Sequence, residues 1–291
     1  MSFVSAKKRL TLGDAINAVM LCIIMALCLF PFLYVISVSF TDPDAYVPMK
    51  LILIPEKLSL ESYQYILSSN NFMTATRNTV GITMLGTVMN LFVTFTFAYG
   101  LTKADIPGTR FLNHLVVFTL IFNAGIVPNY LLVKSLGLIN SQWALILSSL
   151  TSAWDVVVVR SFMHSLPREI EESACIDGCN ELTCFYRIIL PLSKASLATF
   201  TLFFAVMYWN MYFKAMVYLS DSSKWTLQVL LKTMIIDSDS IGFSPTADQN
   251  MLPQETIKMA AIVTSMIPVL IVYPFLQKHF AKGVMVGSVK G

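Results

Sequence analysis

The sequence predicts an all-α, polytopic membrane protein with six transmembrane helices. Of its 291 residues, 56% are hydrophobic and 13% are charged, and a soluble domain of this length carries more charge than that. Six stretches of about 20 residues contain no Asp, Glu, Lys or Arg, and a helix of that length crosses a bilayer. Because lipid offers the backbone no hydrogen-bond partner, we expect these stretches to be helices. They are residues 15–41, 78–102, 111–133, 135–154, 195–213 and 259–277.

The placement of Lys and Arg predicts the orientation of these helices. Most of the 20 Lys and Arg residues lie on the inner side if the N-terminus is inside, as the positive-inside rule requires. We therefore expect both termini in the cytoplasm, with an N-terminal segment (1–15) followed by one membrane domain (16–291). The net charge of +3 then reflects topology, and no nucleic-acid partner is expected. The predicted spans are about 16–40, 74–101, 111–133, 142–163, 195–220 and 256–277.

Two long loops are predicted on the outer face. Residues 41–73 contain the sequence SLESYQYIL, which predicts a short helix opened by Ser59. Residues 221–255 are rich in Asp and Pro. Loops longer than about 15 residues are usually functional or disordered. We expect a docking surface for an external partner, with disorder as the alternative for the second loop.

One long inner loop, residues 164–194, contains the sequence EESACIDGCNELTCFYRIILPL and is called the motif loop below. Pro167 favours the start of a helix, and the glutamates that follow it suit the first helical turns. Gly178 predicts a bend, and Pro191 is expected to end the segment before the next span. The result is a short amphipathic helix parallel to the membrane. An interfacial helix is one interpretation, but the anionic inner leaflet disfavours its acidic charge, so a basic protein partner suits it better.

Neither a nucleotide site nor a metal site is expected in this chain. The nearest match to a phosphate-binding loop, residues 81–87, lies within a span and lacks the required lysine. Cys175, Cys179 and Cys184 cluster in the motif loop, but their spacing matches no CxxC pair and no histidine lies between them. We interpret them as small packing residues, with metal binding as the weaker alternative.

The motif loop resembles the EAA loop of ABC-importer permeases. Three residues separate Glu172-Ser173-Ala174 from Gly178. Nine more separate Gly178 from the segment Ile188-x-Leu190-Pro191, in which x is any residue. This matches the family pattern EAA-x3-G-x9-I-x-L-P, in which the triplet Ile176-Asp177-Gly178 is also usual. The one departure is Ser173, where the family typically has Ala.

Two further segments resemble the carbohydrate-uptake branch of that family, and are similar to the smaller permease of maltose-type importers. They are Trp209-Asn210 in the fifth span and the ending LQKHFAKGVMVGSVKG. The resemblance covers residues 10–291 and is strongest to the subgroup that handles oligosaccharide or polysaccharide fragments. It implies a type I ABC-importer permease fold and a non-catalytic, multi-pass subunit of the bacterial inner membrane that translocates oligosaccharides.

The resemblance also implies partners. They are a second homologous permease, a dimer of ATPase subunits that binds ATP and Mg²⁺, an external solute-binding protein, the oligosaccharide and membrane lipid. No cofactor is expected in this chain itself. The implied mechanism is alternating access, in which ATP closes the ATPase dimer, the coupling helices move, and the spans open outward to receive sugar.

Individual residues are assigned by the same resemblance. The motif forms a coupling helix in a cleft of the ATPase, with Glu172 as the acidic contact and Gly178 allowing close approach. The C-terminal tail reaches into the ATPase dimer, and the 221–255 loop enters the binding protein. The implied coupling residues are Glu172, Ser173, Ala174, Asp177, Gly178, Ile188, Leu190 and Pro191, and the tail residues are Lys282, Gly283, Lys290 and Gly291.

Polar side chains at membrane depth are candidates for the substrate path. Aromatic faces and amides suit a sugar, although the same groups also bond helices together. We hypothesise that Lys214 faces the cavity and favours acidic sugars such as alginate or pectin fragments. Asp155 is a second costly charge within a span. The candidates are Asn123, Asn129, Tyr130, Tyr208, Trp209, Asn210, Tyr212 and Lys214.

Two other functions remain open at this point. An ABC importer of a non-sugar solute would share the motif loop, and only the resemblance of Trp209-Asn210 and of the tail argues against it. A secondary transporter would need ionisable relays inside its spans. Asp155, Lys214 and His114 are the only candidates for such a relay, and they have no obvious partners.

Overall fold

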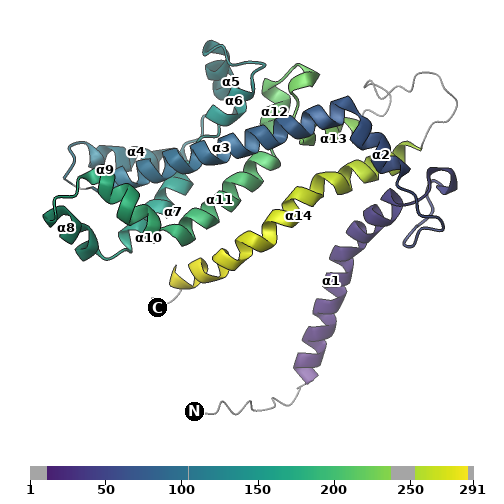
Figure 1. The fold of residues 1–291 in the computed structure, drawn as a ribbon, viewed down its shortest axis with the longest axis horizontal. Helices are drawn as coiled ribbons and strands as arrows, with labels where there is room; N and C mark the ends of the chain where they lie inside the picture. The colour runs from purple at the N-terminus through teal and green to yellow at the C-terminus, as the bar shows by residue number, and fades with distance from the viewer. Residues whose placement is uncertain (1–11, 104, 237–252, 288–291) are drawn as a thin grey trace. The chain divides into compact units, whose positions relative to one another are not determined.

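The described residues of a computed structural model are 12–103, 105–236 and 253–287 (Figure 1). They form helices joined by turns, and this part of the chain has no β-strand beyond one isolated bridge between Thr41 and Leu58. The chain divides into two units, residues 1–68 with 237–264 and residues 69–236 with 265–291. The last helix, α14 (Gln254–Gly287), contributes to both units.

The first unit contains α1 (Leu12–Ser39), the short helix η1 (Pro43–Ala45), α2 (Glu61–Ser68) and the start of α14. The short helix predicted after Ser59 is present as α2, and the backbone N–H of Glu61 donates to Ser59 Oγ at 3.2 Å. Side-chain bonds tie the loop before α2 back to α1. Ser37 Oγ donates to the Leu53 carbonyl at 2.5 Å, and the Ser39 and Tyr63 hydroxyls are 2.7 Å apart.

The second unit is built around α3 (Asn70–Thr102), a helix of 33 residues that begins at the N-cap Ser69. Along α3 pack α7 (Ala153–His164) and α11 (Lys194–Trp209). Aromatic rings fill the contact, and the Phe95 ring on α3 meets the Phe200 ring on α11 edge-on at 6.0 Å. The unit therefore has a continuous helical core that runs the length of α3.

Shorter helices complete the second unit. In Figure 1, α8 and α9 lie near one end of α3, whereas α12 and α13 lie near the other end. These remaining elements are α4 (Thr109–Ile121), α5 (Ile126–Ser135), α6 (Gln142–Leu147), α8 (Arg168–Ile176), α9 (Glu181–Cys184), the π-helical turn η2 (Phe185–Ile189), α10 (Leu190–Leu192), α12 (Phe213–Tyr218), η3 (Ser222–Lys224) and α13 (Leu227–Ile236).

Three predicted spans are each two helices rather than one. Residues 111–133 form α4 and α5, and the break between them contains Gly125 at a φ of +82°. Residues 142–163 form α6 and α7, and residues 195–220 form α11 and α12. Asp155 is explained by the second break, because it lies in the first turn of α7. Its backbone N–H donates to the N-cap Ser152 at 3.2 Å, and the Ser152 hydroxyl donates to the Asp155 carboxylate at 2.6 Å.

Three described helices are long and apolar enough to cross a membrane, namely α1, α3 and residues 254–272 of α14. Residues 181–192 and 194–209 pass together but are bent by 82°. This bend falls at Ser193, whereas the sequence predicted that the segment ends at Pro191. Pro191 lies instead inside α10, which continues directly from the π-helical turn η2. The number of six crossings stays a prediction.

Candidate functional site

The motif loop contains two helices that meet at Gly178. Helix α8 ends at Ile176 with Asp177 as its C-cap, and Gly178 follows with a φ of +84°. The N–H of Gly178 donates to the Cys175 carbonyl, and the N–H of Cys179 to the Ala174 carbonyl, both at 3.0 Å. This pair of bonds is a Schellman cap, whose left-handed residue is usually glycine. The bend predicted at Gly178 is therefore present, and α9 starts three residues later, at Glu181, behind its N-cap Asn180.

Helix α8 has one inward and one outward face. Glu171 and Ala174 are three residues apart and lie on the inward face, where Ala174 is only 9% exposed. Glu172 and Ile176 are four residues apart and face outward, and Ile176 is 85% exposed. Asp177 is also exposed. The outward face thus combines the carboxylate of Glu172 with the large apolar side chain of Ile176, and the exposed Asp177 follows as the C-cap.

The other motif residues divide in the same way. Ser173 is exposed, and its hydroxyl donates to the Ile170 carbonyl within α8 at 3.1 Å. Ile188 and Leu190 are half-buried against the core of the second unit. Pro191 is exposed in the turn of α10. The ILP part of the motif therefore anchors the loop, whereas its acidic part is presented outward.

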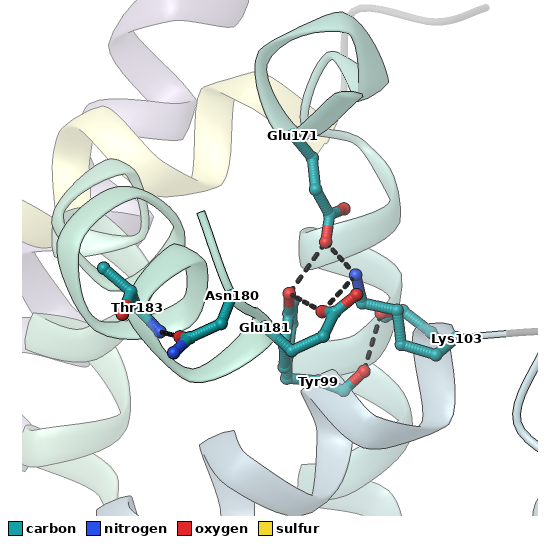
Figure 2. Close-up of polar contacts among 7 residues, drawn as sticks. Tyr99, Lys103, Glu171, Asn180, Glu181 and Thr183 are labelled. Atoms are coloured by element: carbon teal, nitrogen blue, oxygen red, sulfur yellow. Dashed lines mark hydrogen bonds and ion pairs between the residues drawn. The ribbon is translucent and has the colours of Figure 1, made fainter. Parts of the chain in front are cut away.

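Four side chains hold the motif loop to the end of α3, and they are called the clasp below (Figure 2). The Tyr99 hydroxyl donates to Glu171 Oε1 at 2.7 Å and to Glu181 Oε2 at 2.9 Å. Lys103 pairs with Glu171, and its Nζ lies 2.7 Å from Glu181 Oε2. The same amine sits 4.8 Å from the centre of the Tyr99 ring. One cation therefore joins a carboxylate on each side of the Gly178 turn.

Burial and neighbouring charges shift the pKa of Lys103 in opposite directions. Burial on its own lowers the pKa of the Lys103 amine, but the hydrogen bonds and charges of the two carboxylates outweigh burial and raise that pKa. The hydrogen bond from Lys103 is the largest influence on the pKa of Glu181 and lowers it. Both shifts favour the charged forms of Lys103 and Glu181, so this pair is ionic at neutral pH.

A second polar cluster lies at the break between α6 and α7 and is called the Ser149 node. Lys214 Nζ donates to the Ser148 carbonyl at 2.8 Å and to Ser149 Oγ at 2.7 Å. Asn90 Nδ2 donates to the Ser149 carbonyl at 3.0 Å, and the Tyr208 hydroxyl reaches the same carbonyl at 3.4 Å. The break thus frees backbone acceptors that side chains of α3, α11 and α12 satisfy.

The remaining residues predicted on the substrate path fall at separate places. Asn123 Oδ1 accepts from the Gly125 N–H at 2.9 Å, and Asn129 Nδ2 donates to the Gly125 carbonyl at 2.7 Å, so both amides shape the α4–α5 turn. The Tyr130 ring stacks on Tyr218 at 6.4 Å. The role of these three residues on the substrate path, against hydrogen bonding between helices, stays a prediction.

Residues around the end of α11 differ in their exposure. Tyr208 is fully buried, and Trp209 is 6% exposed beside an apolar pocket of about 230 Å³ between α3, α11 and α14. Asn210 is exposed at the C-cap of α11. The half-buried Tyr212 ring lies 5.6 Å from Lys232 Nζ. Of the aromatic candidates on this segment, Tyr208 and Trp209 are buried and Tyr212 is only half-buried.

The C-terminal tail and the predicted second outer loop are described only in part. Lys282 and Gly283 lie within α14, whereas Lys290 and Gly291 lie outside the described residues. The predicted 221–255 loop begins with η3 and α13. Its residues 237–252 also lie outside the described part of the chain.

The sequence predictions missed the clasp and most of the Ser149 node. Lys103 is the first charge after an uncharged span, and that position was the available signal. The pairing of Lys103 with Glu171 depends on residues 68 positions apart, which periodicity cannot show. Asn90 lies in an uncharged span and was not singled out, although an amide at membrane depth is itself such a signal.

Comparison with known proteins assigns the family. No family model matches the chain. The polygalacturonan/rhamnogalacturonan transport system permease protein YtcP of Bacillus subtilis (strain 168) is 46% identical over 91% of this chain and 93% of its own length. Protein LplC of the same strain is 44% identical over 96% of this chain and 95% of its own length.

Solved structures agree with this assignment. A chain from the crystal structure of a bacterial ABC transporter involved in the import of the acidic polysaccharide alginate is 34% identical, with a TM-score of 0.88. The match covers 96% of this chain and 100% of that one. A chain from a complex of the alginate transporter with its alginate-bound periplasmic protein shares the fold at 14% identity and a TM-score of 0.59. The present chain belongs to the family of carbohydrate ABC-transporter permeases.

Proposed function

We propose that this chain is one of two permease subunits of an ATP-driven importer for acidic oligosaccharides. In this proposal an external binding protein delivers the sugar, and a separate ATPase dimer binds ATP and Mg²⁺ and docks on the motif loop. The observation that carries the proposal is the outward face of α8. It presents Ile176 at 85% exposure one turn after the exposed Glu172, and the exposed Asp177 follows as the C-cap of the helix.

The apolar side chain and the charge of this face are better suited to docking in a protein cleft than to exposure to water or contact with a lipid surface. Burying an isoleucine side chain is worth about 1.5–3 kcal/mol relative to leaving it in water. A partner surface that covers Ile176 therefore gains this free energy. The flanking carboxylates favour a cleft with a basic rim and disfavour an anionic membrane surface. Gly178 adds no side chain where the partner would approach, and, apart from its own chain neighbours, no described atom lies within 4 Å of the position its Cβ would take.

Six crossings with both termini in the cytoplasm are part of the same proposal. The pairs α4–α5, α6–α7 and α11–α12 each cross as a broken helix. Broken helices are tolerated at membrane depth where other groups satisfy the freed backbone. At the α6–α7 break, Lys214 and Asn90 supply the donors.

Acidity of the substrate is supported by two observations. The names of similar proteins include a polygalacturonan/rhamnogalacturonan transport system and a transporter of the acidic polysaccharide alginate. Lys214 brings a cation to the Ser149 node, and two of its three ammonium hydrogens bond to Ser148 and Ser149. No other acceptor among the described residues binds this amine, and in the proposal its third hydrogen binds a uronate carboxylate.

Co-purification tests the docking of the ATPase. The chain, expressed with the neighbouring genes of its operon, is expected to purify with a second permease and an ATPase. Glu172→Lys places a positive charge on the docking face and is expected to release the ATPase while the two permeases remain together. The matched control is Glu56→Lys, which breaks an exposed ion pair with Lys50 that contributes little to stability. Retention of the ATPase by Glu172→Lys at the level of the control contradicts the proposed docking face.

Uptake assays test the role of Lys214. Lys214→Met keeps an unbranched apolar chain but removes the ammonium group, so uptake of uronate oligomers by proteoliposomes is expected to fall about tenfold relative to neutral oligomers. Lys134→Met, at the exposed end of α5, is the control and should leave the ratio unchanged. An equal loss of acidic and neutral uptake in Lys214→Met assigns Lys214 to helix packing and ends the acidic-substrate role.

A further inference from the structure

The clasp joins both arms of the motif loop to α3 through a single amine. Glu171 belongs to α8 and Glu181 opens α9, so the two carboxylates lie on either side of the Gly178 turn. Both accept from Lys103 and from the Tyr99 hydroxyl (Figure 2). Because like charges repel, the carboxylates converge only while Lys103 lies between them. The two arms of the loop are thereby held to α3 as one body.

Other contacts reinforce this junction. The Phe185 ring, which follows α9, lies 4.9 Å from the Tyr99 ring. The side chain of Lys103 is 19% exposed and that of Glu171 is 26% exposed. Ion pairs that are largely withdrawn from water are less screened than surface pairs, and removing one partner leaves the other uncompensated. The Lys103–Glu171 pair is therefore more than a surface ion pair, whereas the Glu181 side chain is 62% exposed and its pair with Lys103 is more strongly screened.

At its other end, α3 is bonded to the segment that opens the second outer loop. Asn78 Nδ2 donates to the carbonyls of Ser223 and Trp225 at 2.9 and 3.1 Å. Thr79 Oγ1 accepts from the N–H of Leu227 at 2.7 Å. Asn78 and Tyr99 are about 21 residues apart on one helix, which corresponds to roughly 30 Å. That distance is about the thickness of the hydrocarbon core.

Helix α3 is also the element of the second unit best suited to transmit a displacement. It contains no proline, whereas α14 contains Pro268 and Pro274, and α4–α5, α6–α7 and α11–α12 are broken. Midway along α3, Asn90 contacts the Ser149 node. A rigid displacement at the clasp would therefore reach the Lys214 region and the 223–227 segment without passing through a break.

We propose that Lys103 is a positioning residue that couples the motif loop to α3, and that α3 carries the movement of the loop to the Ser149 node and to residues 223–227. The inference rests on the proposed docking of the ATPase to the motif loop. Loss of Lys103 leaves the outward face of α8 in place, so the ATPase still binds and still hydrolyses ATP. It disconnects that movement from the membrane helices, so less sugar is transported per ATP.

The test compares transport with hydrolysis in the complete importer reconstituted in proteoliposomes. Lys103→Met is expected to keep the ATPase bound and to lower the ratio of sugar transported to ATP hydrolysed by about tenfold, within the usual range of coupling between sites. Lys103→Arg should recover most of the ratio, because a guanidinium also pairs with two carboxylates. Lys134→Met is the control for loss of a lysine elsewhere. An unchanged ratio in Lys103→Met, with the ATPase retained, overturns the inference.

Chemical rescue separates coupling from folding. In a variant without other cysteines, Lys103→Cys is measured before and after treatment with aminoethyl methanethiosulfonate, which restores an ammonium group on the same folded molecules. The transport ratio is expected to rise after this reagent, to stay low with the anionic sulfonatoethyl reagent, and to fall again on reduction. A ratio that stays low with both reagents contradicts the inference. Failure of the wild-type complex to retain an ATPase would instead contradict the proposed function.

Discussion

The close approach of α3 and α11 depends on Gly86. A Cβ at this position would lie 2.7–2.8 Å from three ring carbons of Tyr208. The ring has little room to move, because Tyr208 is fully buried and its hydroxyl reaches the carbonyls of Ile146 and Ser149 at 3.3 and 3.4 Å. Small residues that let backbones approach closely are typical of helix contacts in membranes.

This contact predicts opposite results for two glycines of the same helix. Gly86→Ala should lower the thermal unfolding temperature, because overpacking costs about 1–3 kcal/mol. Gly81→Ala is the control, since apart from the neighbouring backbone of its own helix no described atom lies within 4 Å of its Cβ position. This control should be neutral or slightly stabilising, as alanine favours a helix by about 1 kcal/mol. Intrinsic fluorescence of the detergent-solubilised protein on heating measures both. Equal unfolding temperatures of the two variants would show that Tyr208 does not restrict the approach of α3 and α11.

Adjacent glutamates of the motif loop have different environments. The resemblance to the EAA loop identified Glu172 by its place in the pattern, and Glu172 is exposed in the structure. Glu171 was no more than one of several acidic residues in the sequence, yet it pairs with Lys103. Local patterns could predict the helix, its cap at Gly178 and its acidic character. They could not predict which glutamate turns inward, since that depends on where α3 ends in space.

At the scale of elements, the breaks within predicted spans were the least predictable feature. Hydropathy could locate the apolar segments because burial in lipid depends on composition. It could not locate the breaks at Gly125 or before Ser152, because these depend on side chains that satisfy freed backbone groups. Ser152 and Asp155 form a local cap, and the sequence S-x-x-D was the available signal. Lys214 and Asn90 act from distant segments, so no local pattern indicates them.

The clasp predicts how the attachment of the motif loop depends on pH. Lys103 lowers the pKa of Glu181, so the contribution of that carboxylate is present above the ordinary Glu value of about 4.3 and is lost as pH falls through its lower folded pKa. The raised pKa of Lys103 gives the amine a contribution that is present below about 10.4 and is lost as pH rises through the higher folded pKa. The clasp should therefore hold across the neutral range.

The measurement is the difference in melting temperature between the wild type and Lys103→Met from pH 4 to pH 9 in lipid nanodiscs. This difference should be constant from about pH 5.5 to pH 9 and should shrink towards acid. A difference that grows as the pH falls would contradict an ionic clasp. Lys134→Met provides the baseline for removing an exposed lysine.

At the scale of the whole molecule, a family relationship and a site geometry support one working arrangement. The chain is 46% identical to one curated carbohydrate permease and superposes on a solved alginate-importer chain with a TM-score of 0.88. In the proposed arrangement, the outward face of α8 receives the movement of an ATPase. The clasp passes this movement to the C-terminal end of α3. The N-terminal part of α3 is bonded to residues 223–227, which lead into the predicted second outer loop.

The location of the motif loop is the claim on which this arrangement depends, and Cys175 tests it directly. Cys175 is exposed on α8, so a variant that retains only this cysteine can be labelled with a membrane-impermeant maleimide in vesicles of known orientation. We expect labelling in inside-out vesicles stripped of the ATPase, protection when the ATPase is added back, and no labelling in right-side-out vesicles. Labelling of Cys175 from the outer side would contradict the account.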